Sequence, residues 1–195
     1  MRRQVFFLLI ATGALGCRSE PSPSDTIDRL VEAVQARDSV EVARYIDVGR
    51  VAESSVDPLF QAATILEQND PDGFRAQTGG MGVEMLEQFR PMLAPLMETV
   101  FWQMMLHPEE LQEGPLSTLI GDKPLPFEQL GENYQGVSNE RSDGDDVIVS
   151  VGVANEAANH SVTIDMRLER GEDGWKVVSF ENLADTIASV MGGGA

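Results

Sequence analysis

Residues 147–180 read VIVSVGVANEAANHSVTIDMRLERGEDGWKVVSF, and within residues 147–153 and 161–169 apolar residues recur at every second position. This period is typical of strands that bury one face and expose the other. The first strand has valines on one face, Val147, Val149, Val151 and Val153, with Ser150 and Gly152 on the other. The second strand also has two different faces. Its apolar face has Val162, Ile164, Met166 and Leu168, and its polar face has Ser161, Thr163, Asp165, Arg167 and Glu169. The stretch therefore predicts an antiparallel sheet that is buried on one side.

Two further strands extend this sheet. Residues 175–180 predict a third strand, because the preceding residues 171–174 read GEDG, which suits a tight hairpin loop. Residues 134–141 have a weaker strand pattern. The acidic run at residues 143–146 is too short for a calcium loop, and we predict a hairpin turn there. We expect a curved antiparallel sheet of three to four strands.

Helical spacing dominates the chain before the sheet. The first helix is expected to be capped by Asp25 and to bury Ile27, Leu30, Val31 and Val34. A short helix after Asp38 is expected to bury Val40, Ala43 and Ile46. These helices would have to cover the apolar face of the sheet. The predicted fold class is therefore α+β, with N-terminal helices packed on a curved antiparallel sheet.

The remaining segments have less regular patterns. Residues 47–68 predict a helix with a bend or restart at Pro58, and residues 69–82 predict a turn-rich connection. Residues 86–105 predict a helix that is apolar almost all the way round. Residues 183–191 predict a short closing helix.

The first 17 residues are typical of an export signal, with Arg2 and Arg3 before an apolar core. This core is too short to cross a bilayer as a lasting helix, which needs about 20 residues. Residues 14–17, ALGC, resemble the lipobox of bacterial lipoproteins, with Ala14 where that family most often has leucine. The resemblance implies that Cys17 is diacylated and becomes the new N-terminus. The alternative is ordinary cleavage after Gly16, which would leave the chain's sole cysteine as a free thiol.

These observations predict the organisation and location of the protein. We expect a signal peptide at residues 1–16, a lipidated tether at 17–24, one domain at 25–191 and a flexible tail at 192–195. The expected location is the bacterial cell envelope, lipid-anchored, at the outer membrane and facing the periplasm or the exterior. The membrane is therefore an expected partner, through the acyl chains on Cys17.

The chain is strongly acidic, with a formal net charge of -18. This charge argues against nucleic acid and bare anionic lipid as partners, because both favour clustered Lys and Arg. The simplest interpretation is a solvated acidic surface that keeps the protein soluble. The alternative is adaptation to a saline habitat, since Lys123 and Lys176 are the chain's two lysines.

The sequence predicts no catalytic residue, metal site or cofactor. His107 and His160 are its two histidines, and with Cys17 assigned to lipidation no Cys/His cluster for zinc can form. Neither histidine lies in a motif that supplies a nucleophile or an orienting carboxylate. The many Asp and Glu residues contain pairs by chance, so the sequence selects no acid–base pair.

The helix at residues 86–105 suggests where a ligand or partner would bind. A helix apolar on so many sides is either buried or shares one face with a ligand or partner, and methionine suits adaptable surfaces. The candidate residues for a pocket or a partner surface are Phe101, Trp102, Met105, Met166 and Trp175. We expect all five to be core residues first and pocket walls only second.

Two segments resemble a known family. Residues 25–60, particularly ARD at 36–38 and YIDVGRV at 45–51, resemble the N-terminal pattern of the uncharacterised DUF2939 family. Residues 170–177, RGEDGWKV, are similar to that family's closing hairpin. The order of helices followed by a sheet also resembles NTF2-like lipoproteins more broadly. The resemblance implies an α+β domain of unknown function, leaves an NTF2-like cone open as its architecture, and supplies no catalytic residues.

The expected function is a lipid-anchored binding or interaction module, with an apolar small molecule or an envelope protein as its partner. One alternative is a small NTF2-like enzyme that uses a buried Asp or Glu as general base. Another is a structural envelope lipoprotein without a ligand. A cavity filled by side chains would argue against the enzyme, and a co-purifying protein partner would be the telling observation for the structural lipoprotein.

Overall fold

The computed structural model describes residues 21–107, 131, 133–155 and 160–192. Its elements are α1 (Pro23–Gln35), α2 (Ser39–Tyr45), α3 (Val48–Asn69), α4 (Pro71–Gln77), α5 (Val83–Leu86), the 3-10 helix η1 (Glu87–Phe89), α6 (Arg90–Leu106), β1 (Tyr134–Asp143), β2 (Asp146–Asn155), β3 (His160–Gly171), β4 (Gly174–Phe180) and α9 (Leu183–Gly192). The predicted α+β class is confirmed, because helices precede a four-stranded antiparallel sheet. The predicted leader and Cys17 lie outside the described residues. Gly192, expected in the tail, is the last residue of α9.

The sheet has the strand order β1-β2-β3-β4, so each strand pairs with its neighbour in sequence. Its buried face is the predicted one, with Val149 opposite Met166 and Val151 opposite Ile164. All four residues are at most 1% exposed. The alternation in the sequence therefore identified both strands and the face that they bury.

Both predicted hairpin turns are confirmed by the strand register. Asp143 pairs with Asp146, and Gly171 pairs with Gly174, which leaves two residues in each turn. Gly144 has φ 67° and Gly174 has φ 112°, and glycine adopts such conformations without a steric penalty.

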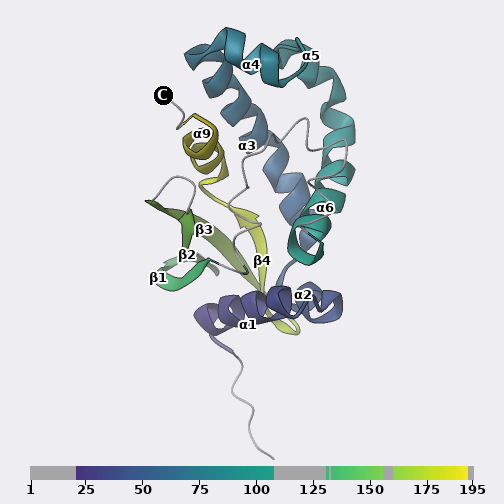
Figure 1. Cartoon of the computed structure of the whole chain (residues 1–195). Coiled ribbons are helices and arrows are strands. Elements are labelled where there is room, and N and C mark those ends of the chain that lie inside the picture. Colours follow the sequence, from purple (N-terminus) through teal and green to yellow (C-terminus); the bar gives the residue numbers. More distant parts are fainter. Residues whose placement is uncertain (1–20, 108–130, 132, 156–159, 193–195) are drawn as a thin grey trace, which may run out of the picture.

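Helices cover the sheet from one face and one edge. Across the apolar face, α1 contacts β1, β2 and β4, and the Tyr134 hydroxyl of β1 donates a hydrogen bond to Asp28 of α1. At the β4 edge, the N–H of Asp47 donates to the Val177 carbonyl at 2.9 Å, just before α3 begins. Figure 1 shows α1 and α2 at one end of the molecule and α4 and α5 at the other.

The first helix begins earlier than predicted. Ser22 is its N-cap, and the Ser22 hydroxyl accepts a hydrogen bond from the Asp25 N–H at 3.1 Å. The Asp25 carboxylate in turn accepts from the Ser22 N–H, which completes a capping box. The prediction that Asp25 is the cap was wrong, because Pro23 is well suited to the first helical turn and leaves Asp25 three residues after the cap.

The buried face of α2 also differs from the prediction. Val40 is 66% exposed and Ala43 is exposed, whereas Val42 is fully buried. The reason is that Ile46 forms a parallel bridge with Val177 of β4. Val42 lies one helical turn before Ile46 and therefore faces the core. Only Ile46 of the predicted apolar set is buried.

Two predictions for the middle of the chain need correction. No restart occurs at Pro58, because α3 continues through it as one helix. The expected turn-rich segment contains α4, which starts at Pro71 with Asp70 as its N-cap. Asp70 accepts a hydrogen bond from the N–H of Gly73 at 3.0 Å, and this pairing of an acidic cap with proline favours a helix start.

Candidate functional site

The five predicted pocket or partner residues all belong to the core region. Phe101, Met105 and Met166 are buried members of the main hydrophobic cluster, and Trp102 and Trp175 are partly buried against it. The Phe101 ring lies 5.9 Å from the ring of Phe180 at the end of β4. The structure thus brings these residues together as packing residues. Their role as pocket walls stays a prediction.

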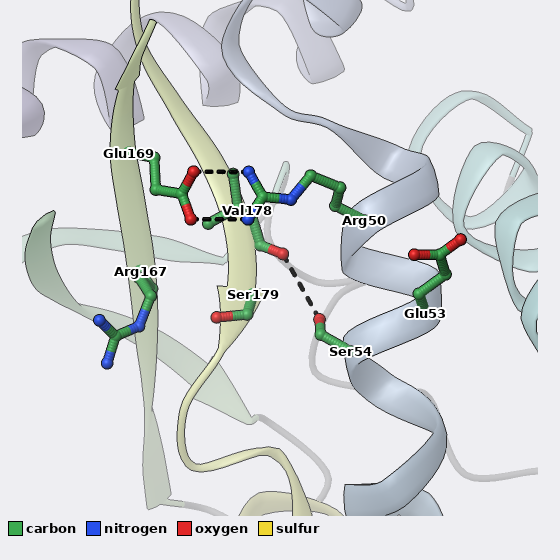
Figure 2. A pocket seen from close by; sticks show the side chains of 7 residues that line it. All are labelled: Arg50, Glu53, Ser54, Arg167, Glu169, Val178 and Ser179. Atoms are coloured by element: carbon green, nitrogen blue, oxygen red, sulfur yellow. Dashed lines mark hydrogen bonds and ion pairs between the residues drawn. The ribbon is translucent and has the colours of Figure 1, made fainter.

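A surface cleft of about 410 Å³ lies between α3 and the strands β3 and β4. Arg50 of α3 reaches across β4 and donates two hydrogen bonds to Glu169 of β3, at 2.5 and 2.6 Å (Figure 2). The Ser54 hydroxyl contacts the Val178 carbonyl at 3.4 Å. These contacts fasten α3 to the edge of the sheet. They form because the sequence places a long cation one turn into the helix.

The cleft has no spare positive charge for an anionic ligand. Hydrogen bonding to Arg50 holds the pKa of Glu169 below its ordinary value of 4.5, and the same contact raises the pKa of Arg50. Arg167, the other cation of the cleft, is bound to carboxylates as well. Glu53 adds a further negative charge at the rim. The cleft is therefore better described as an interlocked ion-pair region than as a binding site.

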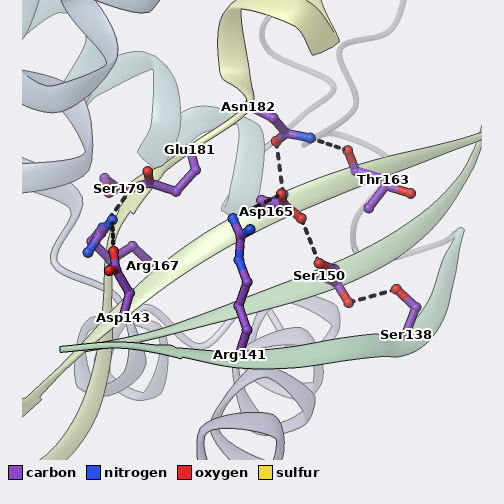
Figure 3. Close-up of polar contacts among 10 residues, drawn as sticks. All are labelled: Ser138, Arg141, Asp143, Ser150, Thr163, Asp165, Arg167, Ser179, Glu181 and Asn182. Carbon is purple, nitrogen blue, oxygen red and sulfur yellow. Dashed lines mark hydrogen bonds and ion pairs between the residues drawn. The ribbon is translucent and has the colours of Figure 1, made fainter. Parts of the chain in front are cut away.

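Arg167 lies among three carboxylates on the face of the sheet opposite the core. Its guanidinium contacts Asp143 at 2.7 Å, Asp146 at 3.0 Å and Glu181 at 2.7 Å. Hydrogen bonding to Arg167 lowers the pKa of Glu181. The cluster joins the β1–β2 turn to the end of β4 (Figure 3), so its evident role is structural.

Asn182 completes the pairing of β3 where β4 has ended. Its side-chain oxygen accepts from the Asp165 N–H at 2.9 Å, and its side-chain amide donates to the Thr163 carbonyl at 2.8 Å (Figure 3). The carboxamide therefore takes the place of a peptide group in the next strand. Beside it, the Ser150 hydroxyl donates to Asp165 at 2.7 Å. The described partners of Asp165 include no histidine that could make a catalytic relay.

One feature of the surface is apolar. Four large side chains are well exposed on α5, η1 and α6: Met85 (49%), Phe89 (43%), Met92 (62%) and Leu96 (40%). We call these four residues the apolar stripe. Met92 and Leu96 are four residues apart on α6 and lie on one side of that helix. Phe89 is the last residue of η1, and Met85 lies on α5. The far end of α6 is different, because Val100, Phe101 and Met104 are buried.

The start of α6 is fixed firmly against α3. Arg90 forms ion pairs with Asp57 of α3 and with Glu87, and its guanidinium lies 4.2 Å from the ring centre of Phe60. These contacts raise the pKa of Arg90 and hold that of Glu87 down. The stripe is therefore presented on a helix whose position is set by polar contacts behind it.

Other classes of site were also considered. Among the described residues, no group of three or more His, Cys, Asp or Glu side chains could hold a metal ion. None of the described helices is both long and apolar enough to cross a membrane. No protein-family model, curated protein or solved structure matches the chain. The resemblance to DUF2939 and to NTF2-like lipoproteins thus stays a prediction.

Sequence reasoning missed the residues that are most informative in three dimensions. The alternation of β3 shows that Arg167 and Glu169 face away from the core, but nothing local identifies their partners on α3 and in the turns. The sequence also did not predict which positions of the apolar helix are exposed. Helical spacing could not separate them, because exposed and buried apolar residues of this segment both recur at that spacing.

Proposed function

We propose that this protein is a lipid-anchored protein of the bacterial cell envelope whose domain acts as an interaction module for another envelope protein. The anchor is the pair of acyl chains on Cys17, at the outer membrane, and the domain faces the periplasm or the exterior. The leader, the ALGC motif and the lack of any other cysteine support this anchor.

The observation that carries the interaction role is the apolar stripe. Contiguous exposed apolar residues on a soluble domain often mark a surface where another molecule binds. The expected pocket residues support the same choice, because Phe101, Met105 and Met166 pack in the core. Exposed apolar side chains, together with candidate pocket residues that are buried in the core, favour docking over the enclosure of a small molecule.

The position of the stripe is consistent with a role away from the membrane. Cys17 is six residues before Pro23, so the extended chain between them spans about 20 Å. An anchor there keeps α1 near the bilayer. The stripe belongs to the α5 and α6 segment, and α5 lies at the opposite end of the molecule from α1 (Figure 1).

Lipidation is tested by expressing the full-length chain in cells fed a labelled fatty acid. We expect label in the wild type, none in Cys17→Ser, and accumulation of the unprocessed precursor when globomycin blocks lipoprotein processing. Ser19→Ala is the matched control and should be labelled like the wild type. Normal processing in the presence of globomycin would refute the anchor.

The interaction role is tested with a photo-crosslinking amino acid placed in the full-length protein. With the probe at Met92 we expect a discrete crosslinked envelope protein after irradiation of intact cells. The control probe replaces Val40, which is equally exposed but lies on α2. Identical products from both positions, or none from Met92, would contradict a specific docking role.

A bound apolar small molecule is the remaining binding alternative. Native mass spectrometry of the gently purified protein would detect it as a mass added to the chain. A ligand lost on Trp102→Ala in a folded protein would favour a pocket at the predicted residues. The general-base enzyme has no observation in its favour, because the described Asp and Glu pKa shifts all point downward.

A further inference from the structure

We infer that the part of β3 that extends beyond β4 is a peptide-binding site, where an extended, lysine-containing segment of a partner protein adds to the sheet as a short strand. The site lies beside α9 and is separate from the apolar stripe, so it does not rest on the docking role proposed for that stripe. Three observations carry it: unpaired backbone groups, a pocket beside them, and a buried hydroxyl that faces the pocket.

The backbone of β3 shows which of its groups point away from β2. Along an antiparallel ladder, the N–H and the C=O of every second residue point to the same side. Both groups of Asp165 point away from β2, because they bond the Asn182 side chain and the Glu181 N–H. The backbone groups of Thr163 and Ser161, two and four residues earlier in the same strand, therefore point to that side as well.

Most of these backbone groups have no partner in the described part of the chain. The Thr163 carbonyl accepts from Asn182 (Figure 3), but the N–H of Thr163 and both groups of Ser161 form no hydrogen bond there. Unpaired N–H and C=O groups along a strand edge are a template on which a segment of another chain can pair. The Asn182 carboxamide already takes the place of one peptide group, and an added segment would continue from it.

A surface pocket of about 220 Å³ lies between this edge and α9. Its lining residues come from both elements and are Ser161, Val162, Thr163, Asp185, Thr186 and Ser189. Neighbouring residues of a strand point to opposite faces, so a pocket that touches three consecutive residues lies at the strand edge. The volume is several times that of one water molecule, about 30 Å³ in the liquid, so the pocket has room for part of a peptide.

Thr186 is a buried polar residue of this pocket. It is 4% exposed, and its hydroxyl has no hydrogen bond to any residue that the structure describes. Buried hydroxyl groups are usually paired, because an unpaired one loses its bonds to water without replacement. A peptide group of an added segment supplies both a donor and an acceptor with which the Thr186 hydroxyl can pair.

The charge of the pocket favours a basic segment. Asp185 is the charged residue among those that line it, and it is exposed and forms no ion pair within the described residues. Its carboxylate can attract a lysine of the added segment. A second copy of this chain is disfavoured as the occupant, because each copy has a net charge of -18.

The probe is a labelled peptide of about seven residues in which threonine and valine alternate around a central lysine, a composition that favours extended strands. Its affinity for the full-length protein in phosphatidylcholine nanodiscs is measured by fluorescence anisotropy, with empty nanodiscs as the blank. We expect saturable binding. The same peptide with N-methyl groups on its central residues should bind at least about tenfold more weakly, because it has lost the backbone donors on both of its edges.

Two positions of the protein test the proposed contacts. Thr163→Pro removes the unpaired N–H at an edge position that tolerates proline, and should weaken binding at least about tenfold. Thr163→Val keeps the N–H and should bind like the wild type. Thr186→Val should weaken binding about fivefold, as expected for the loss of one hydrogen bond, without reducing stability in urea. Thr99→Val makes the same change on α6 and should leave the affinity unchanged.

The charge contact has its own test. Asp185→Asn should weaken binding of the lysine peptide about threefold, and this difference should disappear for a peptide with norleucine in place of lysine. Asp145→Asn, in the distant β1–β2 turn, removes the same charge and should bind both peptides like the wild type.

Several results would overturn the inference. Equal binding of the N-methylated peptide, or full affinity in Thr186→Val, would mean that the probe does not pair with this edge. These two results decide the matter even where Thr163→Pro fails to fold. Absence of saturable binding would leave the pocket to water alone. A dimer seen by sedimentation that disappears in Thr163→Pro would make a second copy the occupant, and tighter binding by a chain that ends at Gly192 would make residues 193–195 the occupant.

Discussion

One residue at the end of α1 has a backbone conformation that is sterically unfavourable for a residue other than glycine. Arg37 has φ 54°, the left-handed conformation that glycine adopts most readily. Around it the Asp38 N–H donates to the Ala33 carbonyl at 3.0 Å, and the Arg37 N–H donates to that of Val34 at 3.0 Å. This pair of bonds is a Schellman motif, whose left-handed position is usually glycine. The helix therefore ends here at a steric cost.

Replacing Arg37 tests this cost. Arg37→Gly and Arg37→Ala both remove the side chain, but only glycine relieves the backbone strain. We expect Arg37→Gly to be more stable than Arg37→Ala by about 1 kcal/mol in urea denaturation. Equal stabilities would mean that residue 37 is not held in the left-handed region.

Asn182 gives a second prediction for one residue. Asn182→Asp keeps an acceptor for the Asp165 N–H but places an oxygen where the amide donated to the Thr163 carbonyl. We expect a loss of about 1–3 kcal/mol at neutral pH, partly recovered in acid as the new carboxyl group gains a proton to donate. The control, Asn139→Asp on exposed β1, adds the same charge and should change stability by less than about 0.5 kcal/mol. Similar losses in both would attribute the effect to net charge.

Local sequence could predict some of these residues and not others. The capping box of α1 was within reach, since Ser22 is followed by a proline and then by an acid at the right spacing. The role of Asn182 could not be predicted from local sequence, because it depends on β4 ending while β3 continues. The last pair of β3 with β4 joins Met166 to Phe180, and nothing local in the sequence sets that end point.

At the scale of elements, α6 combines a surface half with a core half. Met92 is 62% exposed and Met104 is 3% exposed, although both lie in the segment that the sequence predicts as one apolar helix. The strands were predictable because the alternation of apolar and polar residues identifies which face of each strand is buried. The residues of α6 are apolar on almost every side, so the sequence does not identify a buried face. The contacts of α6 with α3 and the core decide which of its ends is buried.

The two methionines make a matched pair for measurement. We expect Met104→Ala to reduce the free energy of unfolding by about 2–4 kcal/mol, because it leaves a cavity in the core. Met92→Ala should change it by less than about 0.5 kcal/mol. Urea denaturation followed by circular dichroism measures both. A large loss from Met92→Ala would mean that the stripe is covered within the protein itself.

At the scale of the whole molecule, ion pairs between distant elements make stability depend on pH. Arg50 and Arg167 hold the pKa values of Glu169 and Glu181 below the ordinary 4.5. As pH falls, the unfolded chain takes up these protons first, so the stabilisation is present above that value and is lost below it. Each exposed pair contributes less than about 1 kcal/mol.

The Glu181→Gln variant measures one such contribution. It should be less stable than the wild type at neutral pH, and the difference should shrink once the pH falls well below 4.5, because the unfolded chain takes up the proton first and the stabilisation by the ion pair is lost. Glu172→Gln, in the exposed β3–β4 turn, is the control and should follow the wild type at both pH values. A difference for Glu181→Gln that does not vary with pH would exclude the ion pair as its cause.

The exposure of the stripe methionines also makes this end of the molecule sensitive to oxidants. Oxidation converts a flexible apolar thioether into a polar sulfoxide, and reductases reverse it. With dilute hydrogen peroxide, peptide mass spectrometry should find Met85 and Met92 oxidised well before buried Met104 and Met166. Equal rates would contradict this difference in access. Under the proposed function, oxidation of two sulfur atoms would weaken docking and their repair would restore it, so the interaction would follow the redox state of the surroundings.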